Sequence, residues 1–391
     1  MLFVLALTAL SISTNFEGGS LGKVERVSEN HYRCAVIGET DQNHRNRQAS
    51  WYYFRVDHAV NRDLTFDMVD LAGEYNFKPT AGSVTRDTPP FYSFDRETWI
   101  PVEDSEFHEE GPSLSFTIHS TSQTVWIAHV PPYTNQNLDR LLKDLARKSA
   151  ATVTSIGKTL EGRPIRLVTI TDPAVPDSAK KILWFIFRQH AWEAGSSWMG
   201  EGLIRFAVSK DPTAAAIRKG TMLKILPLCD PDGVAHGGVR FNRRGFDLNR
   251  NWDVRDPVNM PEIDAERRAL LAGRVDAFVT IHNTETNETL TGPPVPFGAA
   301  RPLLERFYEA FSAGSTFAPS AKPLTAPVTT TEGIAGRMNV VQGLYHDRQI
   351  PAFEIEMRVA AHPKLGHRPL PEDRLRAGRE LLLALWSAMT K

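Results

Sequence analysis

The feature that most constrains this 391-residue chain is a change of hydrophobic periodicity near residue 131. Before it, apolar and polar residues alternate, as in Leu64, Phe66 and Met68 with Thr65 and Asp67 between them. This is the period of half-buried strands. After it, continuous apolar runs such as residues 182–187 alternate with stretches of helical spacing, which is typical of buried strands joined by helices. Because a chain of this length rarely forms one core, the pattern predicts two domains.

We place the boundary in the proline-rich segment that precedes Tyr133. The pattern predicts an all-β sandwich over residues 1–132, with short strands separated by turns. It predicts an α/β domain over residues 133–391, with a mixed, mostly parallel sheet flanked by helices. The helical spacing of the leucines between residues 138 and 145 predicts the first helix of this second domain.

Composition excludes several classes of partner. The chain carries 45 basic and 46 acidic residues, so we expect no nucleic-acid partner. No apolar run approaches the ~20 residues that span a bilayer, and we expect no integral membrane association. Cys34 and Cys229 lie far apart. They form neither a disulfide framework nor a cysteine zinc site, and we interpret both as buried small residues.

The first residues leave the location of the protein open. Residues 1–10 are mostly apolar and are followed by small residues such as Ser11 and Ser13, which resembles a secretory signal within residues 1–13. The segment lacks the positive flank of such signals, and a first strand of the folded domain is the alternative. Both a cytoplasmic and a secreted or periplasmic location therefore stay open.

Side chains with metal-binding chemistry follow two of the predicted buried strands. His190 and Glu193 come after the run at residues 182–187, and His282 comes after the run at residues 275–281. Ligands of open α/β sheets lie beyond the carboxyl ends of strands. Two imidazoles and one carboxylate leave a fourth position open, as at a catalytic zinc. The His190/Glu193 pair and His282 each occur often by chance, so the interpretation depends on the segment between them.

That segment combines a turn with a cluster of arginines. Asp230-Pro-Asp-Gly233 is a turn by composition. Arg240, Arg243, Arg244 and Arg250 follow within a short stretch of a nearly neutral chain. A guanidinium can grip a carboxylate through two parallel hydrogen bonds or stabilise an oxyanion beside a metal. A solvated face is the alternative interpretation.

Together these motifs resemble the zinc metallocarboxypeptidase (funnelin) family typified by carboxypeptidase A. Asp230-Pro-Asp-Gly233 followed by Asn249-Arg-Asn-Trp-Asp253 matches the family's central motifs. His190-x-x-Glu193 before them and His282 after them stand in the family's order. The resemblance extends from about Asn135 to the C-terminus. It implies one Zn²⁺ per chain, held by His190, Glu193 and His282.

The resemblance also assigns roles to further residues. Asn249 and Arg250 would hold the substrate's terminal carboxylate, and Arg240 would polarise the scissile carbonyl. In Phe353-Glu-Ile-Glu-Met-Arg358, Glu356 takes the register of the general base, and Glu354 on the same strand face stays open as the alternative. Arg337 is the candidate for a basic pocket residue, with a plain surface arginine as the alternative. Asn283 departs from the family, which has a small residue after the third ligand, and no tyrosine stands in the register of the mobile substrate-covering tyrosine.

Residues 1–132 look like the β-sandwich that precedes the catalytic domain in cytosolic-type carboxypeptidases, where it does not belong to the active site. That subgroup often acts on acidic C-terminal residues. The function predicted is zinc-dependent hydrolysis of the last bond of peptide or protein C-termini by a metal-activated water, with Glu356 as base. A zinc deacylase of N-acyl amino acids on the same fold and an inactive homologue that binds C-termini are the alternatives.

Overall fold

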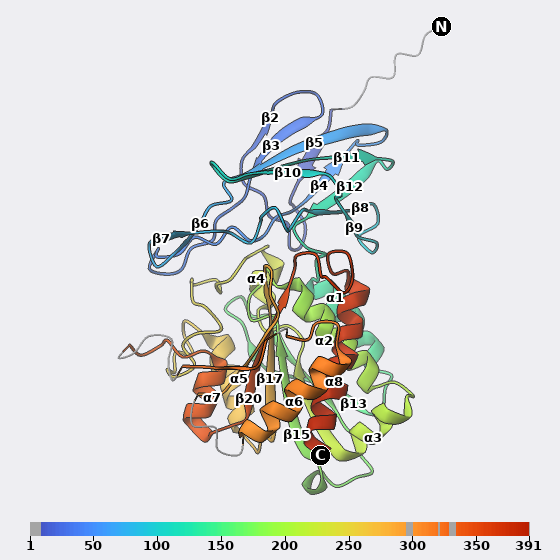
Figure 1. Cartoon of the computed structure of the whole chain (residues 1–391), viewed down its shortest axis with the longest axis vertical. Helices are drawn as coiled ribbons and strands as arrows, with labels where there is room; N and C mark the ends of the chain where they lie inside the picture. Colours follow the sequence, from blue (N-terminus) through green and yellow to red (C-terminus); the bar gives the residue numbers. More distant parts are fainter. Residues whose placement is uncertain (1–8, 295–299, 320, 328–333, 391) are drawn as a thin grey trace.

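The computed structural model describes residues 9–294, 300–319, 321–327 and 334–390. A β-rich front domain lies on top of an α/β domain along the long axis of the molecule (Figure 1). The chain passes from one domain to the other between β12, which ends at Ala128, and α1 (Asn135–Leu145). The boundary predicted after residue 132 falls in this connection and stays a prediction.

The front domain contains two five-stranded sheets that share one apolar core. Alternate residues of the strands point into it, as predicted: Leu64, Phe66 and Met68 are fully buried, and Phe54 and Val56 meet them from the other sheet. In sheet order, the first sheet consists of β1 (Ser11–Ser13), β4 (Tyr53–Asp57), β12 (Thr124–Ala128), β8 (Phe91–Ser93) and β9 (Ile100–Pro101). The second consists of β10 (Ser105–His108), β11 (Ser113–Ser120), β5 (Arg62–Val69), β3 (His31–Ala35) and β2 (Val24–Arg26).

The remaining predictions concern the N-terminal segment, the two cysteines and membrane-spanning helices. Of the segment predicted as a signal or first strand, residues 1–8 lie outside the described residues, and residues 11–13 form β1 against β4. Cys34 and Cys229 are free and buried, as predicted. In the described part of the chain, no helix has the length and apolar character needed to cross a bilayer.

The α/β domain is built on one eight-stranded mixed sheet. Its central strands β16, β15, β17 and β20 are parallel, whereas β14 and β18 run antiparallel to their central neighbours, so the predicted mixed sheet is confirmed. The order is β13 (Ala151–Lys158), β14 (Pro164–Ile170), β16 (Thr221–Leu226), β15 (Lys181–Phe187), β17 (Ala277–Thr284), β20 (Ala352–Arg358), β18 (Thr289–Gly292) and β19 (Leu324–Thr325).

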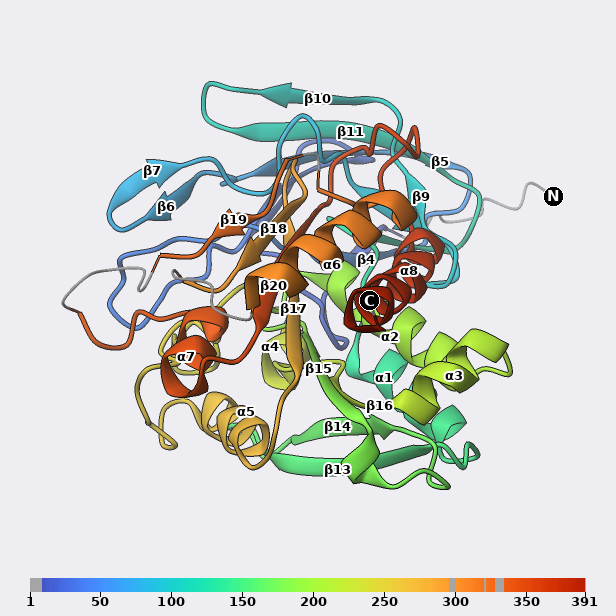
Figure 2. The ribbon, with the colours of Figure 1, turned by 60° about the horizontal axis from the view of Figure 1, so that its bottom comes forward.

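Helices cover both faces of this sheet (Figure 2). Because successive side chains of a buried strand point to opposite faces, Phe185 and Val279 pack on one helical layer, and Trp184 and Phe278 pack on the other. The first layer consists of α1, α2 (Ala194–Ala207), α3 (Pro212–Gly220), α6 (Ala300–Gly314) and α8 (Pro371–Thr390). The second consists of α5 (Pro261–Leu271) and α7 (Val340–Arg348).

Two glycines allow α2 and α8 to pack backbone against backbone. A Cβ atom on Gly202 would lie 2.0 Å from the carbonyl oxygen of Leu375, and one on Gly378 would lie 2.0 Å from that of Met199. No side chain fits at such distances, so glycine is required at this crossing. The crossing fixes α2, whose first turn follows the predicted ligand Glu193.

The segment predicted as a turn at residues 230–233 is instead the start of a short helix, α4 (Pro231–Ala235). The side chain of Asp230 accepts a hydrogen bond from the backbone N–H of Gly233 at 2.8 Å, and Pro231 occupies the first helical position. Both are start signals of a helix. The turn prediction was wrong because the same residue types serve turns and helix caps.

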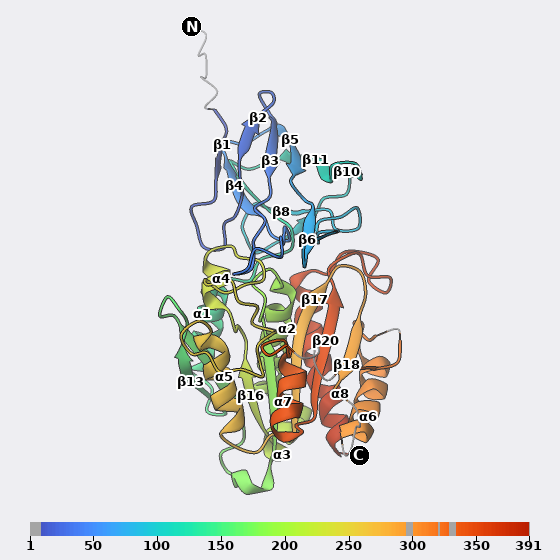
Figure 3. The same ribbon diagram turned by 90° about the vertical axis from the view of Figure 1, so that its left-hand side faces the viewer.

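The front domain packs on the edge of the sheet where the parallel strands end (Figures 1 and 3). The hydroxyl of Ser83 donates to the carboxylate of Glu285, just after β17, at 2.7 Å. The ring of His129 stacks on that of Trp192 with centroids 6.0 Å apart. Aromatic residues of the front domain share the core of the α/β domain, among them Trp51, Tyr53 and Phe91. The two domains therefore form one continuous packed structure at this edge.

Candidate metal centre and substrate site

A sharp turn after β15 directs the first two predicted ligands toward the edge of the sheet. Arg188 takes a left-handed backbone conformation with φ of 64°, which is uncommon for a residue other than glycine. Its buried guanidinium holds the turn by donating to the carbonyl oxygens of Ala191, at 2.7 Å, and Tyr133, at 3.2 Å. Glu193 ends the turn at the N-cap of α2.

The structure brings His190, Glu193 and His282 together. One ligand atom from each lies within 4.8 Å of the others, and all three residues are buried. The Glu193 carboxylate joins the two imidazoles, with 2.7 Å to His190 Nδ1 and 3.0 Å to His282 Nδ1. His282 lies within β17, which continues to Thr284, and not after the strand as predicted.

The donor set fits a zinc ion. Tetrahedral zinc with bonds of about 2.1 Å to nitrogen and oxygen requires ligand atoms about 3.4 Å apart. The distances of 2.7 and 3.0 Å across Glu193 are a few tenths of an ångström shorter. Two imidazole nitrogens and a carboxylate oxygen are ligands that zinc prefers. Small side-chain shifts would therefore admit the ion among these residues.

Polar groups behind the triad orient the two imidazoles. His190 Nε2 lies 3.0 Å from Asp247 Oδ1. His282 Nε2 lies 3.2 Å from Gln189 Oε1 and 3.1 Å from Thr280 Oγ1. A proton on each Nε2 leaves the lone pair on Nδ1, the nitrogen that faces Glu193. Sequence reasoning missed Asp247, Gln189 and Thr280, and only the position of Asp247 two residues before Asn249 could have pointed to it.

Charges within the site favour ionised carboxylates. Burial alone would raise the pKa of Glu193, but the neighbouring His190 and His282 lower it overall. Burial likewise opposes ionisation of Asp247, and Arg240 and His190 outweigh it, so the pKa of Asp247 lies well below its ordinary value. Two negative groups thus face the imidazoles before any metal binds.

Arg240 lies beside the triad. Its Nε donates to Asp247 Oδ2 at 2.7 Å, so one carboxylate links Arg240 and His190. Burial lowers the pKa of Arg240, but the nearby Asp247, Glu193 and Tyr75 raise it overall. A permanent positive charge therefore stands next to the metal position.

The Asn249 side chain lies at the nitrogen of His282 that faces away from Glu193, and Arg250 lines the same cavity as Arg240. The Asn249 amide nitrogen is 3.3 Å from His282 Nε2 and donates to Glu354 Oε2 at 2.9 Å. Its oxygen accepts from the backbone N–H of Val340, in the first turn of α7, at 3.0 Å. Arg250 donates to the carbonyl oxygen of Asn249 at 2.7 Å. Asn249 is therefore held by α7 and β20 beside the second nitrogen of His282.

Glu356 and Glu354 occupy different places relative to the triad. Glu356 is the register partner of His282 in the β17–β20 ladder, and its Oε2 is buried with no hydrogen-bond partner in the described part of the chain. Burial raises the pKa of Glu356 well above its ordinary value, and the charges of Glu193 and Glu354 add to this effect. Glu354 lies 4.0 Å from His282 Nε2, the nitrogen that faces away from Glu193.

Comparison with known families agrees with this geometry. A family model described as zinc carboxypeptidase matches residues 138–282, and one described as the cytosolic carboxypeptidase N-terminal domain matches residues 12–130. The chain therefore contains a zinc carboxypeptidase domain, preceded by a cytosolic carboxypeptidase N-terminal domain. The family resemblance drawn from the motifs is confirmed, as is the mixed α/β fold preceded by a β-rich domain.

Relatives of this chain include cytosolic carboxypeptidase 6 of Mus musculus, which is 30% identical over 278 residues, covering 67% of this chain and 50% of the relative. Cytosolic carboxypeptidase 6 of Caenorhabditis elegans is 29% identical over 275 residues, covering 67% and 58%. The chain thus spans about half the length of these curated relatives. A metallo-carboxypeptidase from Burkholderia cenocepacia shares the fold, with a TM-score of 0.83, 24% identity and coverage of 98% of this chain and 99% of that chain.

The other candidate arginines divide between the site and the surface. Arg337 lines a small cavity together with Arg240 and Arg250. Arg243 and Arg244 are exposed and pair with Glu161 and Asn259. The solvated-face interpretation therefore applies to Arg243 and Arg244.

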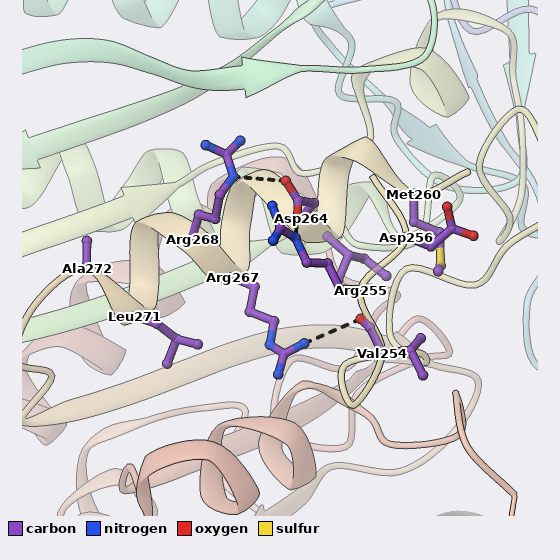
Figure 4. Close-up of a pocket in the computed structure, with 10 residues that line it drawn as sticks. Val254, Arg255, Asp256, Met260, Asp264, Arg267, Arg268, Leu271 and Ala272 are labelled. Atoms are coloured by element: carbon purple, nitrogen blue, oxygen red, sulfur yellow. Dashed lines mark hydrogen bonds and ion pairs between the residues drawn. The ribbon is translucent and has the colours of Figure 1, made fainter. Parts of the chain in front are cut away.

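A wider pocket of about 510 Å³ lies along α5 (Figure 4). It shares no lining residue with the triad or with the small cavity beside Arg240. Most of its charged side chains are already paired: Arg255 and Arg268 both bind Asp264, at 3.0 and 2.9 Å, and Arg267 binds Asp347. We therefore place the functional site at the triad and not in this pocket.

Proposed function

We propose that this protein is a zinc-dependent carboxypeptidase that removes the last residue of peptide or protein C-termini. The observation that carries the proposal is the convergence of two imidazoles and a carboxylate within 4.8 Å of one another. Arg240 lies beside them, because the Asp247 carboxylate binds both Arg240 and His190. Arg250 makes the site specific for C-termini, because a guanidinium binds the free main-chain carboxylate that only the end of a chain offers.

A zinc ion held by His190, Glu193 and His282 would supply a Lewis acid and lower the pKa of a water molecule toward neutrality. Asn249 and Arg250 bind the terminal carboxylate of the substrate. Arg240 donates to the scissile carbonyl oxygen as negative charge develops on it, which is the kind of stabilisation that contributes most in such reactions. Asp247 keeps both Arg240 and His190 in position through its two oxygens.

Glu356 is the general base of this proposal. It takes one proton from the attacking water and returns it to the leaving amine, so that a peptide bond and a water become a carboxylic acid and an amine. The buried Oε2 of Glu356 accepts no hydrogen bond from the described residues and is available to a water. Glu354 is already engaged by Asn249 at 2.9 Å, which supports Glu356 over Glu354.

Matched substitutions of the two glutamates test the base. We expect Glu356→Gln to lower kcat by about 10²–10⁴-fold, the usual contribution of a general base, with zinc content unchanged. Glu354→Gln should stay within about tenfold of the wild type. Release of the last residue from a blocked dipeptide gives kcat, and elemental analysis gives zinc. The reverse ranking would move the base to Glu354.

A substrate panel separates the carboxypeptidase from the other two interpretations. We expect the zinc-loaded protein to shorten a free peptide and to leave the same peptide with an amidated C-terminus intact, because amidation removes the group that Arg250 binds. Preference for N-acyl amino acids over peptides would indicate a deacylase. Binding without hydrolysis of any substrate would indicate an inactive homologue. Varying only the last residue of the peptide then measures side-chain preference.

A further inference from the structure

A side chain of the front domain holds the backbone at Arg240. Glu39, which follows β3 in the chain, accepts hydrogen bonds through Oε2 from the backbone N–H groups of Arg240 and Phe241, the latter at 2.9 Å. These residues are about 200 positions apart in sequence. The two N–H groups lie in a loop and have no helix to satisfy them, so the carboxylate fixes where this loop runs.

Front-domain residues also face the substrate arginines across a small cavity. Arg240, Arg250 and Arg337 of the α/β domain and Arg45, Asn46 and Tyr75 of the front domain line this same cavity. Tyr75 ends β6 (Gly73–Tyr75), in the hairpin with β7 (Lys78–Thr80) that lies at the junction of the domains (Figure 3).

The loop that carries Arg45 is well supported. The buried Asp41 carboxylate accepts from the backbone N–H groups of Arg45, at 2.7 Å, and Asn46, at 3.1 Å. Phe77, in the turn of the hairpin, donates its N–H to the Arg45 carbonyl at 2.9 Å, so loop and hairpin form one unit. On the other side, Gln42 donates its N–H to the carbonyl of Gly245 in the α/β domain at 3.1 Å.

We propose that the front domain forms one wall of the peptide site, with Tyr75 and Arg45 contacting the bound chain end and Glu39 positioning Arg240. The proposal rests on the proposed function, because Arg240 and Arg250 define where the chain end lies. The cavity between the two sets of residues is the space next to the scissile bond. This assignment differs from the expectation that the front domain stays outside the active site.

The chemistry of the wall suits a peptide. The positive charge of Arg45 is balanced by Asp41 at 2.9 Å, so Arg45 offers hydrogen bonds without adding net charge. Tyr75 is 42% exposed at the hairpin edge and presents an apolar ring with a hydroxyl. Such a side chain can pack on a substrate side chain while its hydroxyl reaches a backbone group.

Tyr75→Ala tests the contact, with Phe77→Ala as its control. Phe77 is 66% exposed in the same hairpin and does not line the cavity. We expect Tyr75→Ala to raise KM at least fivefold and to change the ranking of substrates that differ in their last residue. Phe77→Ala should leave both unchanged, and both variants should keep the wild-type Tm. Tyr75→Phe then separates the ring from the hydroxyl.

Failure of the wall contact and failure of the proposed function give different results. If wild type shortens peptides and Tyr75→Ala matches its kcat/KM across the panel, the wall contact is wrong and the proposed function stands. If wild type with bound zinc shortens no peptide, the proposed function itself has failed.

Glu39→Ala and Glu39→Gln test the positioning of Arg240. The amide oxygen of glutamine can accept the same two backbone hydrogen bonds, whereas alanine accepts none. We expect Glu39→Ala to lower kcat at least tenfold with little change in KM, and Glu39→Gln to restore most of kcat. The zinc content of both variants shows that the metal site is intact. Their Tm values are used to choose an assay temperature below unfolding. Equal kcat in the two variants, high or low, would overturn this role.

Discussion

At the scale of single residues, Asp247 links the two halves of the proposed chemistry. One oxygen accepts from His190 and the other from Arg240. We expect Asp247→Asn to weaken zinc binding by about 10–100-fold, as is common when a carboxylate behind a histidine ligand is removed. Competition with a chelator of known affinity measures the effect. Asp264 forms surface ion pairs on α5, away from the triad. Asp264→Asn therefore serves as the control and should leave the zinc affinity unchanged.

Glu266 makes stability depend on pH. It is 1% exposed, and burial, followed by the charges of Glu262 and Asp230, raises its pKa from 4.5 to about 8. Between these values the folded chain holds a proton on Glu266 that the unfolded chain has released. The free energy of unfolding from this group therefore falls as pH rises from about 4.5 to 8 and is level above that.

We expect Glu266→Gln to flatten the fall in stability between pH 5 and pH 8, because an amide does not titrate. Urea unfolding at several pH values measures the slope, and Glu305→Gln, at an exposed glutamate of α6, is the control. An unchanged slope in Glu266→Gln would show that other groups set the pH dependence.

Sequence reasoning predicted the convergence of His190, Glu193 and His282, because three motifs stood in one order along the chain. It missed Gln189 and Thr280, which touch His282 only because a left-handed turn at Arg188 and the pleat of β17 point them there. Tyr75 could not be predicted either, since its approach to Arg240 depends on how two domains dock.

At the scale of elements, the crossing of α2 and α8 depends on Gly202. A methyl group there would meet the Leu375 backbone at 2.0 Å, so the helices must move apart. We expect Gly202→Ala to lower the free energy of unfolding by about 1–3 kcal/mol, the usual cost of overpacking. Gly273→Ala is the matched control, because a Cβ atom there meets nothing within 4 Å. Thermal unfolding of both variants measures the difference.

The elements with strong periodicity were predicted within a few residues, as for α1 and β15. The strand β13 was not predicted, because its sequence Ala-Thr-Val-Thr-Ser-Ile-Gly-Lys is largely polar and none of its residues is fully buried. The helix α4 was taken for a turn because its first residues, Asp230 and Pro231, serve both structures. Polar edge strands and single-turn helices leave too weak a pattern to be recognised without their neighbours.

At the scale of the whole molecule, Arg368 joins the two domains. It is 3% exposed and donates to carbonyl oxygens of Val359 in the α/β domain and of Pro89 and His129 in the front domain. Its guanidinium lies 4.6 Å from the centre of the Phe91 ring. We expect wild type to unfold in one calorimetric transition, because these contacts and the shared core couple the domains.

Arg368→Met should lower the free energy of unfolding by at least about 3 kcal/mol, since it leaves several buried carbonyl groups without a donor. Calorimetry gives the Tm and the number of transitions. Arg86→Met, at an exposed pair with Glu109, is the control and should leave the Tm unchanged. A wild-type Tm in Arg368→Met would show that the domains do not depend on this contact. The two-domain plan was predictable from periodicity, whereas this contact was not, because its partners are about 240 and 280 positions away in sequence.

The contacts of Glu39 and Arg368 have a practical consequence for protein engineering. Glu39 reaches from the front domain to backbone groups of the α/β domain, and Arg368 reaches in the opposite direction. Consider a chimaera that joins the front domain of one relative to the α/β domain of another at the proline-rich connection. The hydrogen-bond donors and acceptors at its domain interface would not match. A successful graft would have to transplant donors and acceptors on both sides together, so the two halves are exchangeable only as a matched set.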